Sequence, residues 1–89
     1  MSSTAEGEFV VKRELGLHAR PAGQFVVLAG SFEAEISVGR GDERVDGRSV
    51  LSLLSLAASC GTKLHIRAEG SDAEQAVAAL GALIEDPGT

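Results

Sequence analysis

The sequence predicts an α+β fold, an open-faced β-sandwich of order βαββαβα, in which a four-stranded, mostly antiparallel sheet carries three helices on one face. Residues 33–38 and 63–69 alternate strictly between apolar and polar side chains, which is typical of strands with one buried and one wet face. Residues 22–30 and 71–84 instead place apolar side chains at helical spacing. No segment has the continuous apolar run of a strand covered on both faces, which argues against a parallel sheet.

The N-terminal third of the chain is expected to hold one strand and one helix. Residues 1–7 offer nothing to bury, so we expect a flexible leader, and "EFVVKR" (8–13) is the predicted first strand. A helix is expected to begin within residues 18–20 and to end at Gly30, acting as a C-terminal glycine. Its apolar stripe consists of Ala22, Phe25, Val26 and Ala29.

The middle of the chain is expected to form a hairpin and a short helix. The strand over residues 33–38 points Ala34, Ile36 and Val38 inward. "GRGDE" (39–43) supplies the turn residues of a hairpin, and a short third strand follows at residues 43–46. A weakly patterned helix is predicted over residues 49–59.

The C-terminal third is expected to form the last strand and then the helix with the clearest sequence signals. The strand over residues 63–69 points Leu64, Ile66 and Ala68 inward. Ser71 and Glu74 have the spacing of a capping box at the start of the helix. Its apolar stripe consists of Ala73, Ala76, Val77, Leu80, Leu83 and Ile84. We therefore expect a single domain over residues 8–86 and a tail at residues 87–89.

Composition excludes several classes of function. The net charge of −5 and the pI of about 4.9 argue against nonspecific binding to DNA or to an anionic membrane. The aromatic fraction of 3% leaves few platforms for stacking nucleic-acid bases. A single cysteine fits a reducing compartment, and neither a membrane-spanning run nor a signal peptide is recognisable. We expect a cytoplasmic monomer with no nucleic-acid partner and no membrane insertion.

The segment "GLHARPA" (16–22) places a histidine where the predicted helix begins. Gly16 permits a backbone turn, and Pro21 in the first helical turn loses no hydrogen bond. The free amides of that turn, near Ala19 and Arg20, and the helix dipole favour an anion. The Arg20 guanidinium suits phosphate oxygens, and a neutral imidazole at His18 is nucleophilic near pH 7. These parts describe a histidine that accepts a phosphoryl group.

The residues alone leave other roles for these side chains open. A histidine at a helix start more often caps the helix or is solvated than acts as a nucleophile. His65 lies on the outward face of its predicted strand and is expected to be solvated. His18, His65 and Cys60 stand at no recognised metal-ligand spacing, so we expect neither a metal site nor a cofactor.

Two blocks of sequence resemble one known family. "GLHARPA" with the following "QFV" closely resembles the active-site segment of the HPr family, the histidine-containing phosphocarriers of the bacterial phosphoenolpyruvate:sugar phosphotransferase system. "GRSVLSLLSLAASCGTKLHIRAEG" resembles the regulatory-serine segment of the same family. The resemblance extends from about residue 8 to residue 86, and the element order expected above is that of the family.

This resemblance implies a carrier that turns nothing over by itself. His18 is then the phosphoryl acceptor, through Nδ1, and Arg20 is its charge partner. The phosphoryl group comes from enzyme I, which is itself charged by phosphoenolpyruvate, and leaves to a IIA component of a sugar transporter. In the family, the serine matching Ser49 is the target of a regulatory HPr kinase/phosphorylase; its local role here is a helix N-cap.

An apolar patch next to the site is expected to bind these partners. The docking residues that we expect are Gln24, Arg48, Val50, Leu51 and Leu54. Leu51 and Leu54 are the candidates for partial exposure. Many relatives carry lysines on the first two helices, where this chain has Val27, Gly30 and Ser52, so partner contacts should depend less on salt.

Two alternative functions remain open. A paralogous carrier in a nitrogen-related or regulatory phosphorelay would use the same His18 chemistry with other partners. A non-catalytic module that acts by binding would use Ser49 as its main switch, but it would have no need of His18 together with Arg20.

Overall fold

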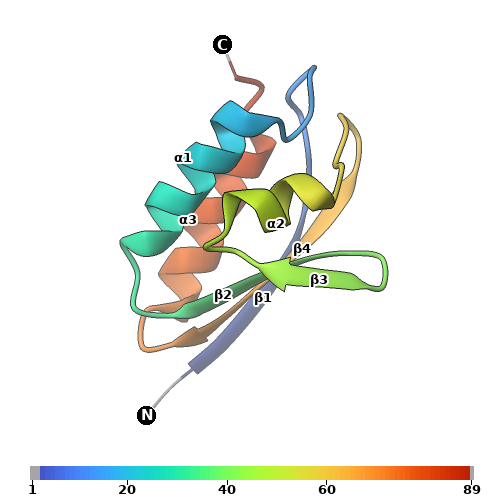
Figure 1. Ribbon diagram of the computed structural model, residues 1–89. Coiled ribbons are helices and arrows are strands. Elements are labelled where there is room, and N and C mark those ends of the chain that lie inside the picture. The colour runs from blue at the N-terminus through green and yellow to red at the C-terminus, as the bar shows by residue number, and fades with distance from the viewer. Residues whose placement is uncertain (1–2, 89) are drawn as a thin grey trace.

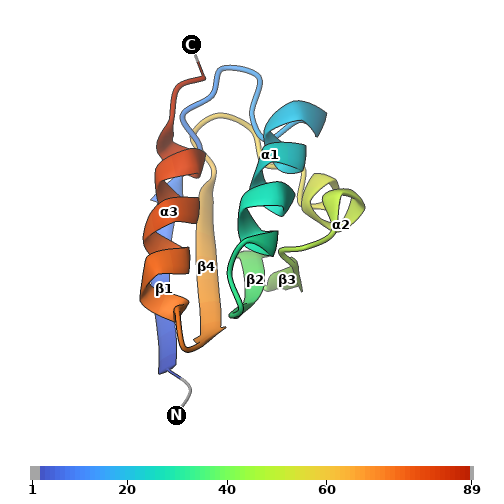
Figure 2. The same cartoon turned by 90° about the vertical axis from the view of Figure 1, so that its left-hand side faces the viewer.

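The computed structural model describes residues 3–88, which form one sheet covered on one face by helices (Figures 1 and 2). In chain order the elements are β1 (Ser3–Val10), α1 (Ala19–Gly30), β2 (Glu35–Arg40), β3 (Glu43–Asp46), α2 (Val50–Ser55), β4 (Lys63–Gly70) and α3 (Ala73–Glu85). The strands lie in the order β1-β4-β2-β3, and each pair of neighbours is antiparallel. The predicted α+β open-faced sandwich is confirmed.

The first strand begins earlier than its apolar pattern indicated. β1 pairs with β4 in unbroken register from Ser3 opposite Gly70 to Val10 opposite Lys63. The flexible leader is therefore wrong for residues 3–7, while Met1 and Ser2 lie outside the described residues. Backbone hydrogen bonds to a neighbouring strand do not require apolar side chains, so a polar segment can still form an edge strand.

The buried faces of the sheet and helices agree with the predicted alternation. Leu64, Ile66 and Ala68 of β4 are fully buried, and Phe25 of α1 is fully buried against the same core. The core is thus mostly aliphatic, as the low aromatic content requires. β3 covers residues 43–46 as predicted, and Gly41 in the turn before it has a positive φ of 59°.

The helix ends differ from two sequence predictions. α1 ends at Gly30, but Gly30 is not in the left-handed conformation of a C-terminal glycine; instead the Ser31 hydroxyl donates to the Leu28 carbonyl at 2.6 Å. Ser71 and Glu74 form no capping box, because α3 begins at Ala73 with Asp72 in the N-cap position.

The Asp72 carboxylate joins the start of α3 to the loop before β2. It accepts hydrogen bonds from the backbone N–H groups of Glu33 and Ala34, both at 2.9 Å. The Glu33 bond is the main cause that lowers the pKa of Asp72 from its ordinary value, against a smaller opposing effect of burial. A tertiary contact thus replaces the local cap that the sequence suggested.

Two further features bear on the function. Ser49 is the N-cap of α2, and its hydroxyl accepts from the Ser52 N–H at 3.2 Å, which confirms the predicted capping role. Within residues 3–88, no helix combines the length and the apolar character needed to cross a membrane.

Candidate functional site

The loop between β1 and α1 carries the histidine motif and is tied to two distant segments. Val11 exchanges backbone hydrogen bonds with residues 61–62, at 2.8 and 2.9 Å. The N–H of Val10 donates to the Glu85 carboxylate at 3.0 Å, and the N–H of Lys12 donates to the Ile84 carbonyl at 3.4 Å. The loop is therefore fixed by the approach to β4 and by the end of α3.

Gly16 brings this loop against the segment that follows α2. Its φ is +74°, and a Cβ atom there would lie 2.5 Å from the Ala58 carbonyl oxygen and 2.8 Å from the Ser59 Cα. The next residue, Leu17, donates its N–H to the same Ala58 carbonyl at 2.8 Å. Only glycine combines this conformation with this closeness, which confirms that the chain turns at Gly16.

His18 is the N-cap residue of α1, but its ring does not cap the helix. The backbone carbonyl of His18 accepts from the Ala22 N–H at 3.0 Å, while the side chain makes no capping hydrogen bond. The His18 side chain is exposed. Pro21 is in the first turn as predicted, and the amides of Ala19 and Arg20 belong to the group that no helix carbonyl can pair. A capping role for the ring is thereby excluded.

An open hollow of about 450 Å³ lies beside His18 at the start of α1. It brings His18 and Arg20, the two predicted catalytic residues, together with the exposed Gln24 one turn further along the helix. It also contains Arg13 and Asp86, which the sequence reasoning did not select. Arg13 comes from the loop before the helix and Asp86 from beyond α3, so only the folded chain places them here.

The other side of His18 is bounded by the exit of α2. A smaller hollow of about 200 Å³ is shared by His18, Ala57 and Ala58. Ala57 has a positive φ of 50°, uncommon for a residue with a side chain. The Arg40 guanidinium holds this turn by donating to the Leu56 and Ala57 carbonyls at 2.8 and 3.0 Å. His18 therefore lies between a C-terminal segment and a backbone turn fixed from β2.

Ser49 is not brought to His18. Ser49 begins α2, whereas the residues that share a hollow with His18 follow its end, and a helix of six residues is about 9 Å long. The expected docking residues on α2 differ in exposure, since Leu51 is 80% exposed while Val50 and Leu54 are half-buried. A modification at Ser49 would therefore act at the surface next to the site.

Arg48 is tied into the fold more than its expected docking role suggested. Its guanidinium donates to the Phe32 and Ala34 carbonyls at 2.9 and 2.8 Å. Its backbone N–H donates to the Asp46 carboxylate at 2.9 Å. Arg48 thus joins the segment before α2 to the loop before β2, although the residue is exposed.

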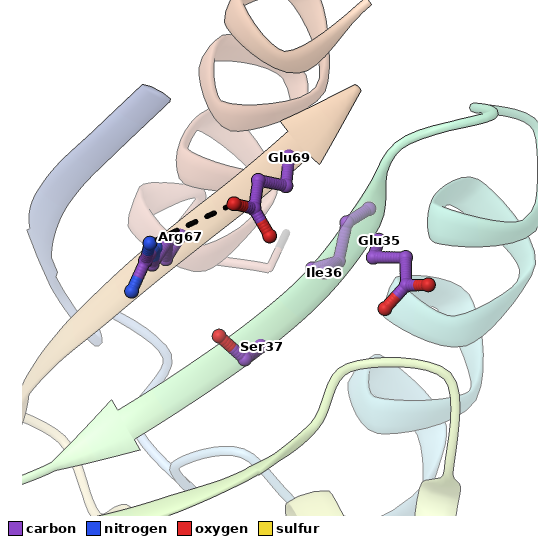
Figure 3. A pocket seen from close by; sticks show the side chains of 5 residues that line it. All are labelled: Glu35, Ile36, Ser37, Arg67 and Glu69. Atoms are coloured by element: carbon purple, nitrogen blue, oxygen red, sulfur yellow. Dashed lines mark ion pairs between the residues drawn. The ribbon is translucent and has the colours of Figure 1, made fainter. Parts of the chain in front are cut away.

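The polar side chains on the open face of the sheet do not form a second site of the same kind. A hollow of about 180 Å³ between β2 and β4 contains Glu35 and Glu69, with an Arg67–Glu69 ion pair at 3.8 Å (Figure 3). Its two carboxylates would repel an anion, and no histidine lines it. His65, on the same face, is bonded to Glu6 at 2.8 Å and to Arg44, so it is not the solvated residue expected.

Comparison with known proteins connects this geometry to one family. A family model described as PTS HPr component phosphorylation site matches residues 5–86. The chain is 42% identical to "Phosphocarrier protein HPr" of Pseudomonas aeruginosa over 89% of both proteins. It is 36% identical to "Phosphocarrier protein NPr" of Shewanella violacea, over 90% of this chain and 88% of that one. The crystal structure of an HPr from Bacillus anthracis superposes with a TM-score of 0.88 at 36% identity, covering 92% of this chain and 98% of that chain.

Proposed function

Because the chain belongs to the HPr family of phosphocarrier proteins of the phosphotransferase system, we propose that His18 is its phosphoryl acceptor. The observation that carries the proposal is the exposure of the His18 ring at the start of α1. Its backbone begins the helix, while its ring stays exposed beside a hollow that also holds two guanidinium groups. The ring is therefore available to a phosphoryl donor.

The transfer requires one bond to form and one to break. The lone pair of a neutral imidazole nitrogen, taken as Nδ1 from the family resemblance, forms a bond to phosphorus. The bond between phosphorus and the donor breaks, and its electron pair leaves with the donor. In the second transfer the P–N bond breaks in the same way, so the protein returns unchanged and turns nothing over alone.

Backbone and side-chain donors stabilise the phosphoryl oxygens during both transfers. The amides of Ala19 and Arg20 lie in the first turn of α1, where the helix dipole favours negative charge. The exposed Arg20 guanidinium adds paired donors that match phosphate geometry. Phosphoryl transfer depends mainly on such positioning and electrostatics, which these groups supply.

We place the carrier in the cytoplasm, as a monomer that receives the phosphoryl group from enzyme I and passes it to a IIA component. The expected docking surface consists of Gln24, Arg48, Val50, Leu51 and Leu54. The 80% exposure of Leu51 supports an apolar contact there, and Val27 of α1 is exposed to 77%. Apolar contacts of this kind depend weakly on salt, so the transfer rate should fall only modestly between low and high ionic strength.

Phosphorylation of Ser49 by an HPr kinase/phosphorylase would regulate docking rather than chemistry. The Ser49 hydroxyl stands at the start of α2, where added negative charge is compatible with the helix dipole. It is separated from His18 by the length of α2. Ser49→Asp should therefore slow transfer from enzyme I and leave labelling by phosphoramidate, a small donor that needs no docking, unchanged. Equal slowing with both donors would contradict this.

The direct test is incubation with phosphoenolpyruvate and enzyme I from the same cell. We expect one acid-labile, base-stable phosphoryl group on the wild-type chain and none on His18→Ala. The matched control is His65→Ala, which removes the only other histidine and should be labelled normally. Label that survives His18→Ala, or no label on the wild type, would refute the proposal.

A second candidate is a carrier in a nitrogen-related phosphorelay, favoured by the similarity to the NPr protein of Shewanella violacea. Both candidates share the His18 chemistry and differ only in their partners. Parallel labelling with the enzyme I of each pathway separates them, since the true donor should label the chain at a much lower concentration. A chain that no enzyme I labels would instead fit the regulatory binding module.

A further inference from the structure

We infer that Arg13 is a second phosphoryl-binding residue, which donates hydrogen bonds directly to the phosphoryl group on His18; the inference rests on the function proposed above. Arg13 is half-buried in the loop between β1 and α1. It borders the hollow of about 450 Å³ together with His18 and Arg20, and it shares a second hollow with His18. The two arginines therefore reach the same space from different segments.

The Arg13 guanidinium lies between α1 and the C-terminal segment. Its Nη2 donates to the Gln24 Oε1 of α1 at 3.5 Å, and a Cβ atom on Gly88 would lie only 2.5 Å from its Nη1. The Arg13 backbone carbonyl accepts from the Gly16 N–H at 2.9 Å, which closes the turn that leads to His18. The same short turn thus connects Arg13 to His18.

The donors of Arg13 are little used by the rest of the described chain. Its bond to Gln24 is at the long limit for a hydrogen bond. Its Nε is buried and has no hydrogen-bond partner among residues 3–88, and within the same range Arg13 forms no ion pair. Because the buried Nε is out of reach of a ligand in the hollow, the terminal nitrogens Nη1 and Nη2 are the donors that would bind phosphate oxygens bidentately.

The charge balance of the hollow indicates why a second guanidinium group is needed there. Asp86 contributes a carboxylate to the same hollow as His18 and would oppose a phosphoryl dianion there. Arg20 alone would only balance that carboxylate. With Arg13 this hollow holds two guanidinium groups against one carboxylate. The second hollow adds the exposed Glu14, so without Arg13 the carboxylates beside His18 would outnumber the guanidinium groups.

The test measures the ionisation of the phosphoryl group itself. The wild type, Arg13→Gln, Arg13→Lys and Lys12→Gln are phosphorylated with phosphoramidate, so that docking plays no part. The pKa of the phosphohistidine is then followed by ³¹P NMR. Lys12→Gln is the matched control, because it removes a positive charge from the neighbouring, exposed residue. Thermal unfolding of each variant verifies that it is folded.

We expect Arg13→Gln to raise the phosphoryl pKa by about one unit, because the guanidinium favours the dianion. Arg13→Lys should give a smaller rise, since it keeps the charge without the paired donors, and Lys12→Gln should stay close to the wild type. Equal values for Arg13→Gln and Lys12→Gln would overturn the inference while leaving His18 as the acceptor. A wild type that is not labelled on His18 would overturn the proposed function itself, and the inference with it.

Discussion

The loop between β1 and α1 needs a glycine at position 16 for two reasons, close approach to another segment and a positive φ, and Gly16→Ala separates them. A Cβ at this position would meet the Ala58 carbonyl oxygen at 2.5 Å and the Ser59 Cα at 2.8 Å, both of them backbone atoms that cannot swing aside. Its φ of +74° adds the strain of a left-handed alanine. Gly41→Ala is the matched control, since Gly41 has a φ of +59° and its Cβ would meet nothing within 4 Å.

The expected magnitudes follow from this difference. The left-handed conformation costs an alanine about 1–2 kcal/mol of folding free energy at either position. Forcing the loop away from residues 58–59 adds about 1–3 kcal/mol for Gly16→Ala only. Both variants lose the same chain entropy in the unfolded state, so that contribution cancels in the comparison. Gly16→Ala should therefore be destabilised by about 1–3 kcal/mol more than Gly41→Ala.

The assay is urea unfolding followed by far-ultraviolet circular dichroism, because the chain has no tryptophan or tyrosine to report by fluorescence. Phosphoramidate labelling is measured in parallel. Gly16→Ala should also label His18 more slowly, since Leu17 and His18 move with the loop, whereas Gly41→Ala should label normally. Equal destabilisation of the two variants would refute the close-approach reasoning, even if both are less stable than the wild type.

Three further predictions concern interactions that stabilise the fold: the packing of α2, the Ser49 N-cap and the Asp72 carboxylate. Leu53→Ala removes a fully buried side chain of α2 and should cost about 2–5 kcal/mol in urea unfolding. Leu51→Ala, at an 80% exposed position, should cost less than about 0.5 kcal/mol, and similar losses would contradict the assigned faces of α2. Ser49→Ala should cost about 0.5–2 kcal/mol by removing the N-cap bond, and an unchanged unfolding midpoint would exclude that cap. Asp72 has a lowered pKa in the folded state, so its stabilising contribution is present above the unfolded pKa of about 3.8 and is lost as pH falls through the folded value. Asp72→Asn should thus unfold at a lower temperature than the wild type at pH 7, with the difference shrinking below about pH 3.8; a constant difference across that range would contradict this.

The sequence predicted well wherever one local pattern decided the structure. The alternation of apolar and polar side chains placed Leu64, Ile66 and Ala68 in the core, because a strand with one solvent-exposed face buries its apolar side chains on the other face. Helical spacing similarly located α1 and its buried Phe25. The histidine at the start of α1 was also found from sequence, since proline and glycine mark the turn around it.

The incorrect sequence predictions have one physical cause: contacts with residues distant in the sequence override the local sequence pattern. Ser71 had the spacing of a cap, but Asp72 took the N-cap position while its carboxylate bound the backbone of residues 33–34. Residues 3–7 lack an apolar pattern, yet β4 supplies their hydrogen bonds. Arg13 was assigned to a strand, and only the contacts with Gln24 and Gly88 place it beside His18. No sequence window contains these pairs.

The wide spread of the segments around His18 has a consequence for synthesis of the protein. A chain emerging from the ribosome presents residue 18 long before residues 58 and 86, which border its hollows, have been made. The loop that carries it is also anchored to residues 61–62 and 84–85, which come late. His18 therefore leaves the ribosome early, but the segments that complete its surroundings are synthesised last. A nascent or truncated chain should consequently be a poor phosphoryl acceptor, and only finished molecules should enter the pool of charged carriers.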